Sequence, residues 1–303
     1  MTSWFFLAIL GHLSNAISFV IDKTLLRSTF KKSATYAAMI GGISFVVVLL
    51  SPWVHTWPAV KIYPYILGFG GFFVLALWAF FEALRKGEAS RVVPIIGSLI
   101  PIFTLIGSLA IFRQNFTGRE LIGFGLLLLA TWLLTSGGKK EGRIPAVVVA
   151  FATAASLLFA AASLCGKYAF DHADWVGVFI LSRVVASVIG IGIGFMFSGS
   201  RLEILKILRG KNSVSSKEAP VSLAIFGQIC GGIGFALVNF ALAEGSAALV
   251  NALQAVQYAA IILAAWFGGS RLRRALNEEV TKKIVLLKFF AILCVAAGLS
   301  LIA

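Results

Sequence analysis

The side chains of this chain that could do chemistry are polar groups that interrupt long apolar runs. His12 and Asn15 lie three residues apart in the run 3–22, and Trp78 lies in the run 63–84. Amides and a phenol follow at similar spacing in two later runs: Gln228, Asn239, Asn251, Gln254 and Tyr258. Polar groups three or four residues apart share one face of a helix. These groups could therefore line a cavity that binds a small molecule, or they could join helices by hydrogen bonds.

A smaller set of ionisable groups could couple a proton or a charge to such a cavity. His12 titrates near neutral pH, although a histidine in an apolar run also serves as a hydrogen-bonded structural residue. Glu82 precedes two basic residues by one helical turn, which favours an ion pair at a helix end. Lys23 and Lys167 end two apolar runs and could reach the membrane interface or bind a carboxylate. Arg183 needs a partner within its run, either a backbone carbonyl, an acid such as Asp174 or an anionic substrate group.

Signatures of an enzyme are absent from the sequence. It contains no phosphate-binding loop, no His-Glu-x-x-His pattern and no Gly-x-Ser-x-Gly elbow, and its three histidines lie far apart. The three cysteines lie in apolar runs without paired spacing, which indicates small membrane hydrophobes and neither disulfides nor metal ligands. We therefore expect no enzymatic activity, no cofactor and no metal, and the chain is too short to hold the nucleotide domain of an ATP-driven pump.

The composition requires a membrane around these residues. Of the 303 residues, 59% are hydrophobic and 13% are charged, and the mean hydropathy is +0.97. A soluble core cannot bury that much apolar surface, because soluble domains carry about 25% charged residues. Transmembrane helices need about 20 apolar residues each, so ten helices with short loops fill the chain. A soluble enzyme, a disordered chain and an outer-membrane barrel are excluded, since barrel strands would alternate apolar and polar residues.

Ten apolar runs are the expected transmembrane helices of this all-α polytopic membrane protein. Thr117 and Glu120 have the spacing of a capping box at the start of the fifth run. Pro94 and Pro101 lie seven residues apart in the fourth run and predict a bend that could open carbonyls to a cavity. The longest connection, 198–220, is basic and rich in serine and is expected to be a mobile loop. The runs cover residues 3–22, 33–53, 63–84, 91–112, 119–136, 144–166, 175–197, 221–243, 247–269 and 284–302.

The net charge of +14 is distributed unevenly between the two sets of loops. The loops after the first, third, fifth, seventh and ninth runs hold about 20 Lys and Arg, and the other loops hold four. Such basic loops set the orientation of the chain and meet anionic lipid headgroups, so we expect no binding of nucleic acid. The positive-inside rule predicts that both termini lie outside the cytoplasm.

An internal repeat divides the chain into two five-helix halves, 1–138 and 139–303. Residues 83–89 align with residues 241–247 at an offset of 158, and Lys23 aligns with Lys167 at an offset of 144. Five is an odd number, so the second half must be inverted relative to the first. Inverted repeats are typical of secondary transporters, which bind their substrate near the membrane midplane between the repeats.

The chain resembles the EamA family of the drug/metabolite transporter superfamily over nearly its whole length. The resemblance rests on the two five-helix halves, on the segment from Glu82 to Pro94, on residues 101–104 and on the turn from Arg113 to Glu120. Arg183 is similar to an arginine common at this place in the family, and the first half has Met39 and Ile40 in the corresponding region. The resemblance implies a ten-helix transporter fold, and members of the family are usually drawn with both termini inside. It leaves the substrate open.

These observations together predict a secondary transporter, or permease, in the inner (plasma) membrane of a bacterium. It would export a small amphipathic metabolite such as an amino acid by alternating access around a midplane cavity, as a monomer or homodimer. The neutral amides and aromatic rings favour such a substrate over a highly charged one. The alternatives are a lipid-carrier or lipid flippase, in which Lys23, Lys167 and Arg183 would hold the headgroup, and a non-transporting membrane scaffold or enzyme.

Overall fold

Two compact units make up the computed structural model of this chain. The structure describes residues 3–25, 33–87, 89–135, 144–208, 221–269 and 281–303. Unit 1 combines residues 1–27, 87–145 and 218–303, and unit 2 combines residues 28–86 and 146–217. Each unit therefore takes helices from both halves of the sequence, so the compact units are not the two sequence repeats.

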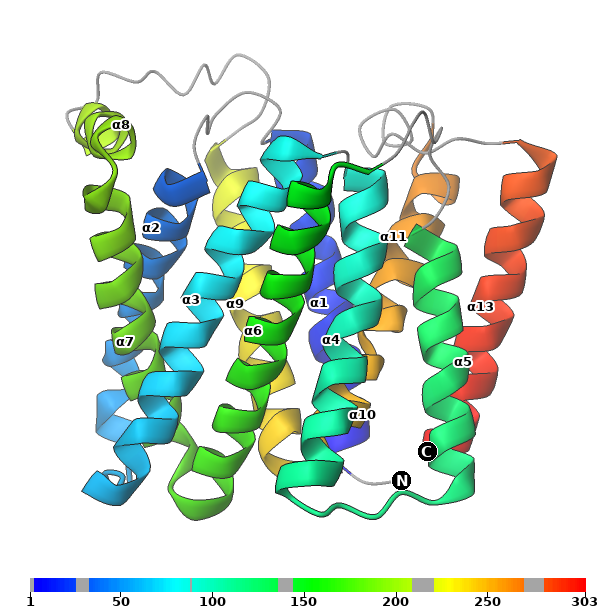
Figure 1. The fold of residues 1–303 in the computed structure, drawn as a ribbon, viewed down its shortest axis with the longest axis horizontal. Coiled ribbons are helices and arrows are strands. Elements are labelled where there is room, and N and C mark those ends of the chain that lie inside the picture. The colour runs from blue at the N-terminus through cyan, green and yellow to red at the C-terminus, as the bar shows by residue number, and fades with distance from the viewer. Residues whose placement is uncertain (1–2, 26–32, 88, 136–143, 209–220, 270–280) are drawn as a thin grey trace. The chain divides into compact units, whose positions relative to one another are not determined.

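Unit 1 is an antiparallel bundle of helices drawn from three parts of the chain (Figure 1). Helix α1 packs along α9, α5 packs along α13, and α4 packs against α10. Helix α1 begins and α13 ends at the same end of this unit (Figure 1). Its helices are α1 (Ser3–Leu25), α4 (Ala89–Ile111), α5 (Gly118–Thr135), α9 (Val221–Glu244), α10 (Ala247–Ala252), α11 (Gln254–Phe267) and α13 (Lys282–Ile302).

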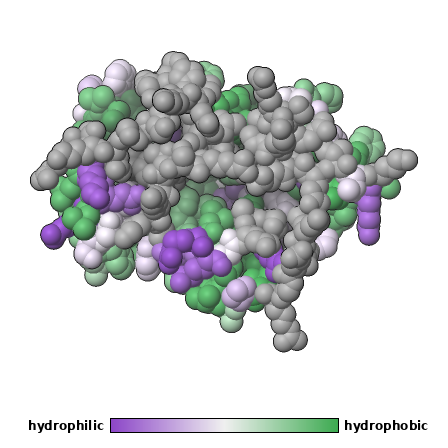
Figure 2. All heavy atoms as spheres, turned by 90° about the horizontal axis from the view of Figure 1, so that it is seen from above, coloured by the Kyte–Doolittle hydropathy of each residue, from purple (hydrophilic) through white to green (hydrophobic). Residues whose placement is uncertain are grey.

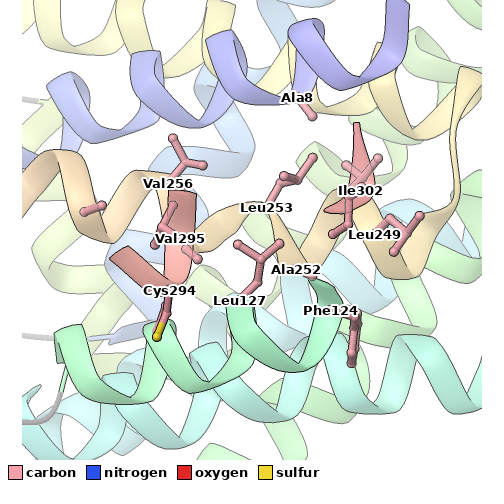
Figure 3. Packing of buried hydrophobic residues seen from close by; sticks show 14 of the residues in the cluster. Ala8, Phe124, Leu127, Leu249, Ala252, Leu253, Val256, Cys294, Val295 and Ile302 are labelled. Carbon is pink, nitrogen blue, oxygen red and sulfur yellow. The ribbon is translucent and has the colours of Figure 1, made fainter. Parts of the chain in front are cut away.

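The core of unit 1 lies between α1, α5, α10, α11 and α13. Figure 3 shows Leu127 of α5 directed toward Ala252 and Leu253, with Val295 of α13 beside them. Leu127 and Leu253 are fully buried. A membrane supplies no hydrophobic driving force between helices, so this close packing and the interhelical hydrogen bonds hold the bundle.

Unit 2 is built around α3, α6 and α7. Helix α3 packs along α6 and also against α7, and α2 packs along α7. A short helix, α8, follows α7 and contacts both α7 and α2. The elements of unit 2 are α2 (Ser33–Ser44), η1 (Phe45–Trp53), η2 (Val60–Ile62), α3 (Tyr63–Lys86), α6 (Ala146–His172), α7 (Trp175–Met196) and α8 (Ser198–Leu208).

Glycines allow the paired helices to approach closely. A methyl group added at Gly231 of α9 would lie 2.7 Å from the Ser18 hydroxyl of α1, and one at Gly227 would lie 2.8 Å from Ile21. Gly123 of α5 and Gly298 of α13 face each other's carbonyls in the same way, at 3.0 Å. Small residues at helix crossings are the usual device by which membrane helices pack.

The expected apolar runs form helices throughout the described residues, in which no strand occurs. Nine helical stretches of the described chain are long and apolar enough to cross a membrane, which makes the protein an integral multi-pass membrane protein. The remaining run, 33–53, is α2 followed directly by the 3₁₀ helix η1.

The capping box is confirmed, since the Thr117 backbone N–H donates to Glu120 Oε2 over 2.7 Å. The Glu120 backbone N–H points back at Thr117 Oγ1 over 3.3 Å.

Two expectations about segment ends were wrong. The sixth helix does not end at residue 166 but continues to His172, so Lys167 lies within it. The connection 198–220 is not a loop throughout, because residues 198–208 form α8, whereas residues 209–220 lie outside the described part.

Figure 2, which looks from above onto the ends of the helices, shows hydrophilic side chains in patches among hydrophobic ones. Four exposed bases lie at this end of unit 2: Arg85, Lys86, Arg201 and Lys206.

Candidate functional site

The strongest candidate site lies in unit 1, where the ninth apolar run is broken into α10 and α11. Helix α10 ends at Ala252, Leu253 is a single turn residue, and α11 begins at Gln254. The carbonyls in the last turn of a helix have no partner within that helix. The Leu253 N–H satisfies two of them, those of Leu249 and Asn251. The break therefore exposes backbone acceptors inside an apolar span, where an unsatisfied carbonyl costs several kcal/mol.

His12 of α1 satisfies a third carbonyl at this break. Its Nε2 lies 3.0 Å from the oxygen of Val250, and the side chain of Gln257 on α11 lies beside the imidazole. Since a carbonyl can only accept, Nε2 must carry the proton of this bond. Only 5% of His12 is exposed. The expectation that His12 is hydrogen-bonded is thus confirmed, and its partner is a carbonyl of the broken helix.

Helix α4 supplies the opposite wall of the break. The Asn251 amide donates to Thr104 Oγ1 over 3.0 Å, and Thr104 in turn donates to the Ile100 carbonyl over 2.7 Å. Two turns further along, the Tyr258 ring lies against Gly97, where an added methyl would come within 2.9 Å of the hydroxyl oxygen.

Pro101 lies level with this break. The Thr104–Asn251 and Gly97–Tyr258 contacts lie on either side of Pro101 on one helix and of Leu253 on the other. Pro101 has no N–H, so the carbonyl one turn earlier in α4 loses its usual partner. Two neighbouring helices therefore interrupt their backbone hydrogen bonding at the same level.

The other polar residues expected in unit 1 are less concentrated. Asn15 of α1 lies at the close approach to Gly234 of α9. Asn239 is buried, and its amide donates to the Phe235 carbonyl of its own helix over 2.8 Å. Gln228 is exposed, Gln254 is half-buried beside the break, and the Lys23 side chain lies outside the described part. The structure thus gathers His12, Asn251, Gln254 and Tyr258 around one helix break.

Unit 2 contains a second unusual group, a buried arginine between two aromatic rings. The Arg183 guanidinium carbon of α7 lies 4.9 Å from the ring centre of Phe69 and 4.5 Å from that of Phe73, both on α3. Arg183 is 2% exposed. The delocalised, weakly hydrated guanidinium is the cation best suited to such stacking. Asp174, one expected partner of Arg183, instead caps α7 by accepting the Gly177 N–H over 3.2 Å.

The remaining charged candidates in unit 2 have local partners. Glu82 accepts from Arg85 over 2.7 Å, which confirms the expected ion pair at a helix end. The expected snorkelling of Lys167 was wrong: its side chain is 9% exposed, and its ammonium lies 2.7 Å from Asp171, one turn later in α6. Trp78 packs edge-on against Phe151 and stacks on Phe197. In the described residues, no cluster of three or more His, Cys, Asp or Glu could hold a metal ion.

Sequence reasoning missed the backbone and ring partners of these groups. Val250 and Leu253 are apolar residues in an apolar run, so no side-chain signal marks the break. Thr104 could have been found, because it lies on the same helical face as Pro101 and Gly97. Phe69 and Phe73 lie four residues apart, so the sequence places both rings on one face of their helix.

Comparison with known proteins relates the first part of this chain to a family of membrane proteins. Residues 2–136 match the model of the EamA-like transporter family. That family is a branch of the drug/metabolite transporter superfamily. The match covers the first sequence half and all of α1 to α5.

A solved structure supports the same fold over the whole chain. Its title reads only "Crystal structure of protein", its TM-score is 0.67, and its identity to this chain is 15%. The alignment covers 100% of this chain and 99% of that one. A search of curated proteins gave no match. At this identity the likeness concerns the fold alone.

Proposed function

We propose that this protein is a secondary transporter of a small amphipathic metabolite, with its substrate site at the break between α10 and α11. The observation that carries the proposal is the gathering of His12, Asn251 and Tyr258 where two neighbouring helices interrupt their backbone hydrogen bonding. Interrupted helices in corresponding parts of two repeats are the best pointer to a transporter's binding site. The match of residues 2–136 to a family of transporters supports transport as the activity.

The proposed architecture has ten spans in two inverted repeats, with α2 and η1 together as the second span. The 12 residues of α2 rise about 18 Å and the nine residues of η1 rise about 18 Å. Their sum of about 36 Å exceeds the hydrocarbon thickness of about 30 Å. The span begins as an α-helix and tightens to a 3₁₀ helix, which explains why neither part alone has the length of a span.

The pattern of helix pairs supports the repeats. Exchanging each helix of one half with its counterpart in the other turns the α1–α9 pair into the α6–α3 pair, and both pairs pack along their lengths. The same exchange turns the pairs α2–α7, α4–α10 and α5–α13 into themselves, and all three occur. Sequential halves joined in this way support alternating access by movement of one group of helices against another.

The groups at the break favour a neutral or zwitterionic substrate. Amides, a phenol, a hydroxyl and an imidazole offer donors and acceptors without a fixed charge. An amino acid or a molecule of similar polarity matches this set better than a polyanion. As the sequence predicts, we also propose that the protein lies in a bacterial inner membrane and exports its substrate.

The decisive experiment is a thermal-stability panel on purified protein against amino acids, nucleosides, quaternary amines, organic anions and drugs. A ligand at 100 times its Kd stabilises the folded state by about 2.7 kcal/mol. Asn251→Leu and Gln254→Leu should each remove the shift and abolish transport in proteoliposomes while the melting temperature of the unliganded protein changes little. Asn115→Leu, an amide in an exposed loop, is the matched control and should keep both.

Two results would overturn the proposal. Ligand shifts and uptake that survive in Asn251→Leu and Gln254→Leu would remove the site from the break. Movement of a labelled phospholipid across liposomes, with no shift from any soluble class, would make the protein a lipid flippase.

A further inference from the structure

Helix α8 is a short element that cannot cross a membrane. Its 11 residues rise about 16 Å, half of the hydrocarbon thickness. It begins two residues after α7 ends, because Phe197 takes an extended conformation and redirects the chain. Figure 1 shows α8 end-on and α7 lengthwise, so α8 lies crosswise at the end of the α7 span. A crosswise helix at the end of a span lies at the membrane surface.

One face of α8 is fixed to unit 2. The Thr35 hydroxyl of α2 donates to Glu203 over 2.7 Å, and Ile204 reaches the close approach of α7 and α2 at Gly194. Ser200 is 2% exposed. The Glu203 carboxylate is thereby turned toward α2, which leaves the other face of α8 without its negative charge.

The opposite face of α8 carries two leucines with a base on each side. Leu202 is 58% exposed and Leu205 is half-buried, and Arg201 and Lys206 are exposed. Residues 201 and 205, and residues 202 and 206, are each four apart, so the four side chains form one continuous face. Met196 and Phe197, at the end of α7, add exposed apolar surface next to it.

We propose that this face of α8 binds an anionic phospholipid at the membrane surface. The leucines would enter the boundary between headgroups and acyl chains, and Arg201 and Lys206 would pair with the phosphate and the negative headgroup. A helix that lies in the interface has this combination of basic flanks and apolar stripe. The charge of the face decides the partner, because a zwitterionic lipid offers the two bases no net negative charge. The inference is independent of which substrate the protein transports.

Bound lipid would also restrain α2 and α7. Helix α8 is joined to α2 through Thr35 and to α7 through the single residue Phe197, so a lipid that holds α8 at the surface holds the ends of both helices. The site would thus make the position of these helices depend on the lipid composition of the membrane.

The test is hydrogen–deuterium exchange of the peptide 197–206 in the full-length protein, measured in nanodiscs. Discs of dioleoyl phosphatidylcholine alone are compared with discs that contain one third dioleoyl phosphatidylglycerol. Each base near an anionic surface contributes about a fivefold factor, so phosphatidylglycerol should slow exchange of this peptide by up to about 25-fold. Arg201→Gln with Lys206→Gln should remove the slowing. Lys61→Gln with Arg119→Gln, which removes two exposed bases elsewhere, should keep it.

Three outcomes would overturn the proposal. Equal exchange in both kinds of disc would show that the face does not select negative charge. Slowing that persists in the Arg201→Gln/Lys206→Gln variant would move the lipid to another place. Slowing by millimolar inorganic phosphate in phosphatidylcholine discs would replace the lipid with a free anion. Exchange of α13 peptides, recorded in the same runs, reports whether a variant has lost its fold.

Discussion

At the scale of single residues, His12 has a structural role, because it hydrogen-bonds to a backbone carbonyl of the broken helix. The break after Ala252 leaves the Val250 carbonyl without a partner in its own helix, and the imidazole supplies that partner from α1. A histidine is suited to this because one ring nitrogen can donate while the other remains an acceptor. The same side chain can therefore donate to the Val250 carbonyl and accept a hydrogen bond from a ligand.

Replacing His12 tests this role. His12→Ala should lower the free energy of unfolding by about 1–3 kcal/mol, because a buried carbonyl is left unsatisfied. The matched control is Leu13→Ala, one residue further along α1, where the side chain is exposed. Denaturant unfolding in detergent measures both. An equal change in the two variants would contradict a specific role for the bond to Val250.

The aromatic bracket around Arg183 is the second residue-scale feature. A guanidinium within about 6 Å of a ring face gains about 0.5–2 kcal/mol, and the larger values apply to desolvated groups such as this one. Phe73→Leu should therefore lower the melting temperature of the protein more than Phe72→Leu, the neighbour on α3 that is exposed. If the two leucine variants melt at the same temperature, the rings act only as apolar filling.

At the scale of elements, the helix pairs depend on glycines at particular places. Gly234 of α9 lies against the backbone of α1, where an added methyl would meet Asn15 and the Gly11 carbonyl. Gly232 lies two residues away, and an added methyl there would meet nothing within 4 Å. The two positions share a helix and a residue type and differ in what faces them.

The pair gives a controlled test of helix packing. Gly234→Ala should destabilise the protein by about 1–3 kcal/mol through overpacking against α1. Gly232→Ala should be neutral or slightly stabilising, because alanine favours the helix by about 1 kcal/mol over glycine. Thermal unfolding in one detergent compares them. Similar losses from both substitutions would mean that α1 and α9 do not meet as described.

The sequence predicts the spans well because length and apolarity alone make a membrane helix. It predicts α8 and the break at Leu253 poorly for two different reasons. The first turn of α8 is rich in serine and glycine, which favours a loop when the turn is taken without its contacts to α2 and α7. Leu253 is fully buried and carries no glycine or proline signal, so tertiary packing sets the break.

The candidate site, like the fold, could be predicted from the sequence only in part. His12, Asn251, Gln254 and Tyr258 could be named from the sequence, because polar groups in apolar runs are conspicuous. The sequence could not predict that these residues gather around the carbonyls at the helix break, because the types of the residues at the break do not indicate an interruption of the helix. Asn239 is conspicuous for the same reason, yet its amide bonds to its own helix.

At the scale of the whole molecule, the two sequence halves that we propose as inverted repeats are not equivalent. At the repeat offset of 158, Phe69 and Phe73 correspond to Gly227 and Gly231. The aromatic pair holds Arg183, whereas the glycine pair lets α9 approach α1. An inverted repeat with identical halves would make its two access states equally stable. In the proposed transporter, these differences between the halves would favour one of the two states.

The distribution of charge over the whole chain predicts the orientation of this asymmetric molecule. About 20 Lys and Arg lie in one set of loops and four in the other, and both termini lie with the sparse set. Lys61 and Lys86 mark the two sets, and both are exposed. They lie close to the two ends of α3, whose 24 residues separate them by about 36 Å.

Single cysteines at these two lysines should reveal which end faces the cytoplasm. In a chain whose three native cysteines are replaced by serine, Lys61→Cys should react with a membrane-impermeant maleimide in intact cells, and Lys86→Cys should react only after lysis. This result would place both termini outside, as the positive-inside rule requires for loops this short. The reverse labelling would place both termini inside, in the orientation that the family resemblance implies. The 20 bases would then face outward, and the anionic lipid of α8 would have to belong to the outer leaflet.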